Sequence, residues 1–418
     1  MTVIKRDLYL NQIINRKHNG LIKIISGIRR CGKSYLLFDL FKQHLLDNGI
    51  KETHIIATAL DGFGQEKYRN PEEYYNFITS QIKDDDMYYI LLDEVQLMDK
   101  FESVLNGLMR IKNADIYVTG SNSRFLSSDV VTEFRGRGDE IRIYPLNFAE
   151  FYSVSNNDFQ TAWKEYSTFG GMPLVLSYKN TADKIKYLQN LFKETYLRDI
   201  LDRNKIKNNE ELEELINITA SNIGCLTNPK RLSDTFASVK HVDLSAPTIA
   251  QYLDYLHDAF IISKAIRYDI KGKKYISTPY KYYFADTGLR NARLDFRQYE
   301  ETHLMENIIY NELSIRGFNV DVGSIELLDK SADAKYVKKN TEVDFVANQG
   351  SKRVYIQSAL EMTTEDKKEQ EKRSLMGIRD SFKKIIIVKS DIVPYQDEDG
   401  ITIIGLKDFL LNPNSLEL

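Results

Sequence analysis

The chain has 418 residues, with 57 Lys and Arg against 60 Asp and Glu, and a formal net charge of −3. At roughly 150 residues per domain, this length predicts two or three domains. A hydrophobic share of 42% and a charged share of 28% are typical of a globular protein, and they exclude a disordered or fibrous chain. The balanced charge excludes nucleic-acid binding through the overall field, so such binding would need a local basic patch.

Cysteine content and hydropathy indicate the compartment. Cys31 and Cys225 are too few for a disulfide framework, which favours a reducing cytoplasm. We find no signal-peptide pattern and no apolar run long enough to cross a bilayer, so we expect a cytoplasmic protein without membrane contact. The six histidines show no paired ligand spacing, and the sequence therefore predicts no zinc site.

Residues 1–20 carry apolar side chains near helical spacing and predict a short helix beneath a sheet. The next stretch, Leu21–Leu40, predicts a strand, a glycine-bounded loop and a helix. Between Gly27 and Ser34 the sequence GIRRCGKS fits G-x-x-x-x-G-K-[ST] without mismatch. Glycines allow backbone N–H groups to turn inward around phosphate oxygens, where a Cβ would crowd the ligand.

This loop predicts an ATP·Mg²⁺ site. Lys33 is expected to reach the β- and γ-phosphates, the Ser34 hydroxyl to ligate Mg²⁺, and the helix N-terminus to add partial positive charge. We expect nucleotide contacts from the whole loop and the residue after it: Gly27, Ile28, Arg29, Arg30, Cys31, Gly32, Lys33, Ser34 and Tyr35. For Cys31 two interpretations stay open. The helix N-terminus and the lysine favour a thiol that alkylates readily and that ATP protects, and the alternative is a small residue that fits.

A second strand (53–60), a helix (74–82) and an apolar strand closing on Asp93 and Glu94 follow. Asp93 is expected to hold the water shell of Mg²⁺, and Glu94 to polarise the attacking water as general base. We expect Asp93 to arrive on the strand next to the one that carries the phosphate loop. The alternative interpretation is a strand with an acidic cap.

Residues 115–120 predict a further strand whose polar tip lies beside the γ-phosphate. Thr119, Ser121 and Asn122 are candidate sensors there, and we assign Asn122 to nucleotide binding. Next, Arg135 and Arg137, separated by glycine before a strand at 140–144, predict an arginine finger that stabilises transition-state charge. A solvated basic turn is the alternative. Action within the chain and action on a neighbouring copy both stay open.

These strands and helices predict a first domain, 1–150, with an α/β parallel sheet covered on both faces. Residues 151–205 predict a helical subdomain, either a lid over the nucleotide or a packing unit. Residues 206–295 resemble a winged helix, with helices at 232–238 and 248–260, a β-wing at 261–276 and an aromatic, turn-rich segment at 281–290. The second helix offers acids and no Arg or Lys, so both DNA and protein remain candidate partners.

The last region, 296–418, resembles the restriction-endonuclease-like fold: a helix (305–316), three strands (320–322, 342–346, 354–357), a helix (367–380) and a final strand (384–389). Glu306 and Asp344 match the acidic positions of that fold. The third motif reads Gln357-Ser358-Ala359 and lacks its carboxylate and lysine. A metal site needs the second carboxylate, and hydrolysis needs the lysine to steady the hydroxide, so we expect a nuclease-inactive domain.

Taken together, GIRRCGKS, YYILLDE, VTGSNSRF, FRGRG, FGGMP, KYYFADTGL and EVDF resemble a family of bacterial and archaeal AAA-type ATP-binding proteins with a C-terminal domain of unknown function. The resemblance implies ATP binding at 27–34, Mg²⁺ and hydrolysis chemistry at Asp93 and Glu94, and a nuclease-like C-terminal domain. Our expectation is an ATP-hydrolysing switch that reports its nucleotide state to a partner, with homo-oligomer formation left open. The alternatives are an ATP-gated nuclease and a nucleotide-dependent DNA-binding module.

Overall fold

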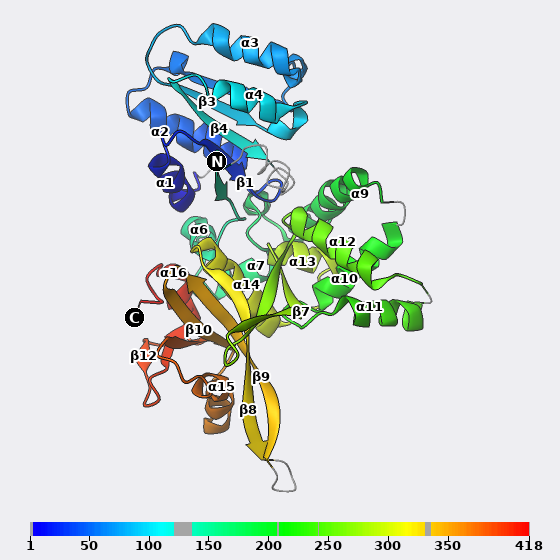
Figure 1. The fold of residues 1–418 in the computed structure, drawn as a ribbon. Helices are drawn as coiled ribbons and strands as arrows, with labels where there is room; N and C mark the ends of the chain where they lie inside the picture. The colour runs from blue at the N-terminus through cyan, green and yellow to red at the C-terminus, as the bar shows by residue number, and fades with distance from the viewer. Residues whose placement is uncertain (1–2, 121–135, 207–208, 241, 331–335, 418) are drawn as a thin grey trace. The chain divides into compact units, whose positions relative to one another are not determined.

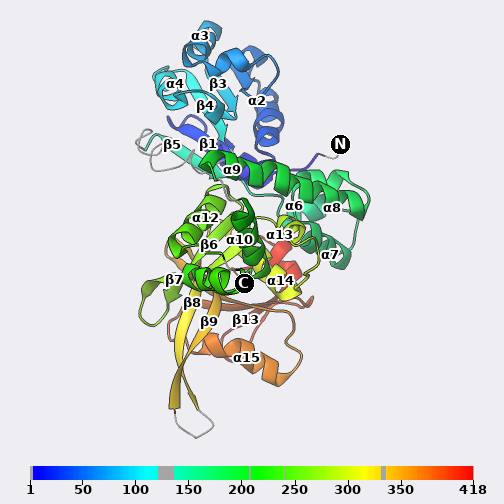
Figure 2. The same ribbon diagram turned by 90° about the vertical axis from the view of Figure 1, so that its right-hand side faces the viewer.

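The structure is a computed structural model that describes residues 3–120, 136–206, 209–240, 242–330 and 336–417. The chain divides into two compact units (Figures 1 and 2). The first consists of Met1–Pro145 with Asp258–Phe260, and the second of Leu146–His257 with Ile261–Leu418. Among the described residues, no helix combines the length and apolar character that a bilayer crossing requires.

The first unit is a parallel α/β sheet, as the sequence predicts, and its five strands lie in the order β2-β3-β4-β1-β5. Helices α3 and α4 cover one face, and α1, η1 and α2 cover the other (Figure 1). Its elements are α1 (Asp7–Asn15), β1 (Ile22–Ser26), η1 (Tyr35–Phe41), α2 (Lys42–Asp47), β2 (Ile55–Ala59), α3 (Pro71–Gln81), β3 (Tyr88–Asp93), α4 (Phe101–Leu108), β4 (Ala114–Gly120) and β5 (Gly138–Arg142).

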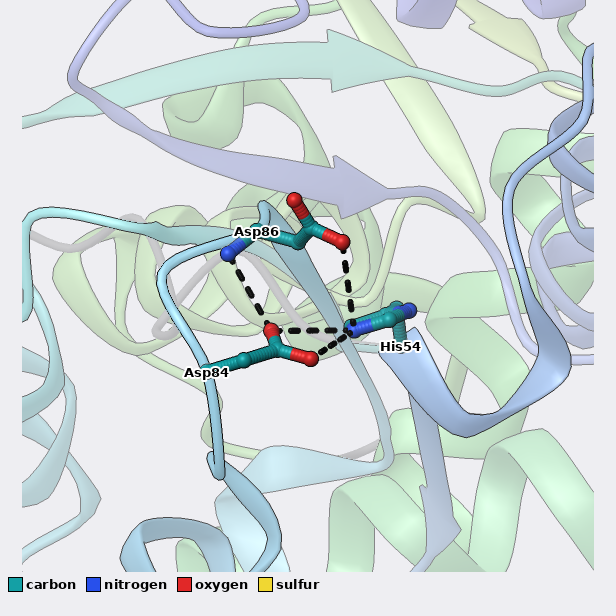
Figure 3. A group of neighbouring side chains, drawn as sticks. All are labelled: His54, Asp84 and Asp86. Atoms are coloured by element: carbon teal, nitrogen blue, oxygen red, sulfur yellow. Dashed lines mark hydrogen bonds and ion pairs between the residues drawn. The ribbon is translucent and has the colours of Figure 1, made fainter.

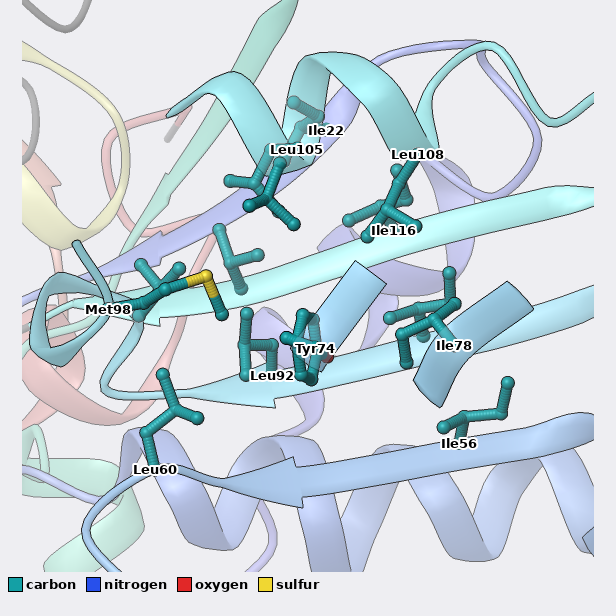
Figure 4. Close-up of a cluster of buried hydrophobic side chains, with 14 of the residues drawn as sticks. Ile22, Ile56, Leu60, Tyr74, Ile78, Leu92, Met98, Leu105, Leu108 and Ile116 are labelled. Carbon is teal, nitrogen blue, oxygen red and sulfur yellow. The ribbon is translucent and has the colours of Figure 1, made fainter. Parts of the chain in front are cut away.

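Local sequence explains these elements. Strands β1 and β3 are buried along their whole length, which matches their near-continuous apolar sequence. Helix α3 begins at Asn70, whose side chain accepts hydrogen bonds from two first-turn N–H groups, with Pro71 just inside the start. Figure 4 shows the core between the sheet and helices α3 and α4, built from Ile22, Ile56, Leu60, Tyr74, Ile78, Leu92, Met98, Leu105, Leu108 and Ile116.

The strand order differs from our expectation in one respect. Strand β3, which carries Asp93, does not pair with β1, because β4 lies between them. The chain order of strands leaves their spatial order open, since each crossover helix lets the next strand pair on either side. Two strand spacings, roughly 10 Å, therefore separate the backbones of β1 and β3.

The second unit has an eight-stranded sheet, in the order β12-β13-β11-β10-β9-β8-β6-β7. Its strands are β6 (Ile262–Asp269), β7 (Lys274–Phe284), β8 (Asn319–Lys330), β9 (Tyr336–Gln349), β10 (Lys352–Ala359), β11 (Lys383–Val388), β12 (Tyr395–Gln396) and β13 (Thr402–Gly405). Its helical elements include α6 (Phe148–Val154), α7 (Phe159–Phe169), α8 (Thr181–Asn190), η7 (Leu191–Leu197), α9 (Arg198–Asn204), α10 (Asn209–Ser221), α11 (Pro229–Thr235), η8 (Phe236–Lys240), α12 (Ala246–Asp258), α13 (Thr287–Arg293), α14 (Glu301–Ile315), α15 (Glu365–Met376) and α16 (Leu406–Leu411).

The sequence predicts a wing and a separate C-terminal region, and the sheet runs across both. The predicted wing is the hairpin β6–β7, and β6 also pairs in parallel with β8 of the C-terminal region. Residues 281–284, expected to be turn-rich, are instead the buried end of β7. Strand β11, expected to be the last, is followed by β12 and β13, which extend the sheet at its other edge. These strands were missed because short β runs carry little periodicity.

Glycines explain the FGGMP and ADTG segments. Asp286 is buried, and its carboxylate accepts hydrogen bonds from the N–H of Gly171 at 2.6 Å and of Leu289 at 2.9 Å. A Cβ on Gly171 would lie 2.0 Å from the carbonyl oxygen of Leu146. One on Gly288 would lie 2.0 Å from the carbonyl oxygen of Phe169. Because a Cβ at either position would meet main-chain atoms, no flexible side chain could move aside for it. These glycines are therefore needed for α13 to pack beside α7.

We expect Gly288→Ala to lower the free energy of unfolding by about 3 kcal/mol or more, because its methyl group meets main-chain atoms. Gly350→Ala is the matched control. Gly350 has φ +59° and nothing within 4 Å of its Cβ position, so only backbone strain of about 1 kcal/mol applies. Urea unfolding of the two variants measures the difference, and equal stabilities would contradict the packing argument.

Candidate functional site

The loop between β1 and η1 lies at the carboxyl end of β1 and packs closely against main-chain atoms. Gly27 has φ +143°, and a Cβ there would lie 2.2 Å from the carbonyl oxygen of Ile143, the residue that follows β5. The N–H of Ile143 donates to Ser26 at 2.8 Å. Gly32 has φ +103°, a conformation that side-chain-bearing residues rarely adopt. Both glycines of the motif are therefore required by the geometry of the loop.

Lys33 spans this loop. Its Nζ donates to the carbonyl oxygens of Gly27 at 3.0 Å and Ile28 at 3.2 Å, and the residue is only 4% exposed. No described carboxylate forms an ion pair with it. A buried ammonium that only carbonyl oxygens compensate favours an incoming anion. Lys33, which the sequence predicts to reach the phosphates, thus bridges two carbonyl groups of the loop.

Ser34 begins the helix that follows. It has helical backbone angles, is exposed, and makes no capping hydrogen bond with the first turn. A hydroxyl that does not cap its own helix can serve as a ligand for a hydrated cation. The N–H of Leu36 donates to the carbonyl of Gly32 at 2.9 Å, so the helix starts directly from the loop. Helix N-termini of this kind favour phosphate groups.

Asp93 and Glu94 are tied to the tip of β4. The Thr119 hydroxyl donates to the buried Asp93 carboxylate and accepts from the N–H of Glu94 at 3.0 Å. Glu94 has φ +53°, so the chain turns sharply as it leaves the strand, and Gln96 donates to its carboxylate. Thr119 therefore couples the two predicted catalytic acids, which is the position expected for a sensor at the strand tip.

One residue of the site was missed. Arg6 is 2% exposed, and its guanidinium donates to the carbonyls of Cys31 at 3.0 Å and Tyr144 at 2.7 Å. It also lies 4.7 Å over the ring of Tyr9. Arg6 thereby fixes the phosphate loop to the segment after β5. The sequence offers no signal for this role, because an arginine before a helix is common and its partners are backbone carbonyls distant in the chain.

The burial of Cys31 bears on its two open interpretations. The thiol is fully buried, with Sγ 3.8 Å from the carbonyl oxygen of Ile143, so it does not present the accessible sulfur that ready alkylation requires. The alternative of a small residue that fits the loop agrees with this burial. Arg29 and Arg30 at the loop tip are exposed, and the Tyr35 hydroxyl donates to Ile4 at 3.4 Å.

The structure separates Arg137 from the phosphate loop. Its carbonyl accepts from the N–H of Ile22 at the start of β1, and its side chain donates to Asn106 at 3.2 Å. Because β1 and β5 are parallel, Arg137 lies at the amino end of the sheet, opposite the loop. Action of Arg137 within its own chain is therefore disfavoured. Arg135, Ser121 and Asn122 lie outside the described residues.

A second group of charged residues lies in the other unit. Lys281 of β7 pairs with Glu306 of α14 at 2.9 Å and Glu342 of β9 at 2.5 Å. Tyr283 donates to Glu306 at 2.6 Å, and the Asp344 carboxylate accepts from the N–H of Ser358 at 2.8 Å. The predicted pair, Glu306 and Asp344, is thus joined by a carboxylate and a lysine, the two group types absent from the third motif. Both came from positions that sequence reasoning did not consider.

Burial and like charge govern these groups. Burial raises the pKa of Asp344 well above its usual value, and the neighbouring Glu306 raises it further. Burial also raises the pKa of Glu342, although Lys281 opposes the shift. For Lys281 burial acts to lower the pKa, but Glu306 and Glu342 outweigh it, so the ammonium stays charged. Lys281 therefore neutralises part of a group of acids that otherwise repel one another.

A comparison with known proteins gives the family. An uncharacterized protein of Haemophilus influenzae is 34% identical over 415 residues, which cover 98% of this chain and 99% of that protein. This chain belongs to the same family. An uncharacterized protein of Methanocaldococcus jannaschii is 27% identical, covering 95% of this chain and 86% of that protein. The AAA domain profile matches residues 19–152, and a profile of a domain of unknown function, DUF8612, matches residues 160–300.

The AAA domain match and the phosphate loop on a parallel sheet give the first unit the fold of a P-loop NTPase. Among solved structures, the Aeropyrum pernix ORC1 protein in complex with DNA has 10% sequence identity and a TM-score of 0.28, over 70% of this chain and 92% of that one. Such a likeness is too weak to carry an argument about function. The AAA and DUF8612 profile matches end by residue 300 and do not bear on the expected restriction-endonuclease-like region.

We expect Arg6→Gln to weaken ATP binding about tenfold, because the loop loses charged hydrogen bonds of about 1.5–3 kcal/mol each. Arg16→Gln is the control. Arg6 directly precedes α1, whereas Arg16 directly follows it and pairs with Asp139 at 2.9 Å, part-exposed and away from the loop carbonyls. Titration calorimetry with ATP and Mg²⁺ measures both affinities, and equal values for the two variants would contradict the role of Arg6.

Proposed function

We propose that the protein binds ATP·Mg²⁺ in its AAA domain, hydrolyses it, and acts as a nucleotide-dependent switch on a partner. The observation that carries the proposal is Lys33, a buried ammonium held across a glycine-bounded loop and paired with no described carboxylate. The phosphates of ATP would supply the missing negative charge. We further propose that the protein works in the cytoplasm.

The chemistry follows from the residues at the carboxyl edge of the sheet. Mg²⁺, when bound, would neutralise charge on the phosphates, with Ser34 as a ligand and Asp93 holding its water shell. The Glu94 carboxylate would accept a proton from the attacking water. The Thr119 hydroxyl bonds the Asp93 carboxylate and the backbone N–H of Glu94. Loss of the γ-phosphate would therefore be transmitted to β4 through this one hydroxyl.

The position of Arg137 supports a homo-oligomer in this proposal. Since it lies at the amino end of β5, its guanidinium would stabilise transition-state charge only on a neighbouring copy. The second unit would report the nucleotide state. Its α10–α12 region and β6–β7 hairpin would contact a protein or DNA partner, and a steep salt dependence of DNA binding would favour DNA.

Lys33→Ala is expected to abolish ATP binding, and Glu94→Gln to keep binding while lowering turnover by about 10²–10⁴ fold. The control is Lys42→Ala, because Lys42 is a part-exposed lysine of α2 that pairs with Glu52. Calorimetry measures binding and phosphate release measures turnover. Wild-type turnover in Lys33→Ala would remove the proposal.

A second candidate function is a nuclease gated by ATP. The observation that favours it is the presence of Lys281 and Glu342 beside Glu306 and Asp344, since these supply the lysine and carboxylate that the third motif lacks. Against it, the Lys281 ammonium already bonds two of the carboxylates a metal ion would need. We therefore place this candidate second.

We expect no nicking of supercoiled plasmid by wild-type protein with Mg²⁺ or Mn²⁺, with or without ATP. Gel electrophoresis of the plasmid gives the readout. Nicking by the wild type that disappears in Asp344→Asn and persists in Glu326→Gln would establish the nuclease. Glu326 is the control because it pairs with Lys338 at the surface, away from the buried group.

A further inference from the structure

A histidine and two aspartates meet at the amino end of the first unit's sheet (Figure 3). His54 directly precedes β2, and Asp84 and Asp86 lie in the turn that leads into β3. The His54 Nε2 atom is 3.1 Å from both carboxylate oxygens of Asp84 and 4.0 Å from Oδ2 of Asp86. Imidazole nitrogen with carboxylate oxygens is a ligand set used by divalent transition metals.

The spacing of these atoms fits an ion. Zinc bonds of roughly 2.0–2.2 Å place neighbouring ligand atoms of a tetrahedron roughly 3.3–3.6 Å apart. The distances from Nε2 bracket that value, and one ligand atom from each of the three residues lies within 4.8 Å of the others. The side chains of Asp84 and Asp86 are 48% and 67% exposed, so small rotations suffice to close around an ion.

The donors are held in place before any ion binds. The His54 side chain is only 6% exposed, and its ring packs edge-on against Tyr88 with centroids 4.5 Å apart, so Nε2 faces the two acids. Asn113 donates to the carbonyls of Asp84 and Asp86, each at 2.9 Å, and thereby fixes the turn. A buried imidazole directed at a preformed acidic turn is what distinguishes this group from scattered surface acids.

Without a metal ion, hydrogen bonds join His54 to Asp84. Hydrogen bonding to His54 holds the pKa of the Asp84 carboxyl below its usual value. Lys51 lies 3.6 Å from Asp86 with a side chain 68% exposed. A metal ion binds the neutral imidazole, and the exposed Lys51 side chain can move into solvent.

We propose that His54, Asp84 and Asp86 bind a divalent transition-metal ion of the zinc class, with water completing its coordination. The ion would link the segments that lead into β2 and β3, and these two strands pair along their length. The nitrogen ligand disfavours Mg²⁺, which prefers oxygen, so this site is chemically distinct from the nucleotide's cation. It also lies at the opposite edge of the sheet from Gly27–Ser34, so the proposal does not rest on ATP hydrolysis.

The test is zinc binding by the full chain without nucleotide or magnesium, measured by calorimetry and by chelator competition. We expect the wild type to bind one equivalent that is lost, or weakened about tenfold or more, in Asp84→Asn, Asp86→Asn and His54→Gln. Asp85→Asn is the matched control, since Asp85 is an exposed acid of the same turn that contributes no ligand atom to the group. It is expected to keep wild-type affinity.

Two results would overturn the site. One is wild-type protein that binds no zinc at submillimolar concentration. The other is Asp84→Asn and Asp86→Asn binding as tightly as Asp85→Asn. Zinc held elsewhere, for example at the hydrogen-bonded Cys225 and His303, would remain in every variant and cancels in this comparison. Because both aspartates are exposed, their amide variants fold even where His54→Gln does not.

Discussion

The phosphate loop of the first unit holds a buried lysine whose ammonium donates to carbonyl oxygens of the loop. Lys33 is held by the carbonyls of Gly27 and Ile28, and these point at it only because the loop turns through two glycines. An ammonium removed from water without a counter-charge is costly unless an anion arrives. The loop and the helix start that follows it lie at the carboxyl end of β1, beside this ammonium.

The second unit also contains a buried lysine, but there the counter-charge comes from the protein's own carboxylates. There the buried cation is Lys281, and its charge is already matched by Glu306 and Glu342. The surplus lies with the acids, as the raised pKa of Asp344 shows. Lys33 has no described carboxylate as an ion-pair partner. Lys281, in contrast, completes an ionic group that joins β7 to α14 and β9. This contrast is why the first site takes precedence as the functional one.

Short contiguous motifs were enough for the sequence to predict local geometry, and the nucleotide roles of their residues stay predictions. Gly27–Ser34 needed no information from outside the loop, and Asp93 with Glu94 followed from an apolar strand that ends in acids. Sequence reasoning left two interpretations of Cys31 open, and the burial of the thiol against Ile143, a residue distant in the chain, favours the small residue that fits. It left open whether Arg137 acts within its own chain or on a neighbouring copy, and parallel pairing with β1 places this residue at the amino end of the sheet, away from the loop.

By itself, then, the sequence determined the local chemistry: which loop can hold phosphates, which strand delivers acids, and that the first domain is a parallel α/β sheet. Only the tertiary structure decided which distant groups meet. It inserted β4 between β1 and β3, brought Arg6 onto the loop, placed Lys281 among the carboxylates, and joined His54 to Asp84 and Asp86 across thirty residues. The physical reason is that strand pairing and side-chain burial depend on contacts between segments, and periodicity within a segment carries no information about its partner.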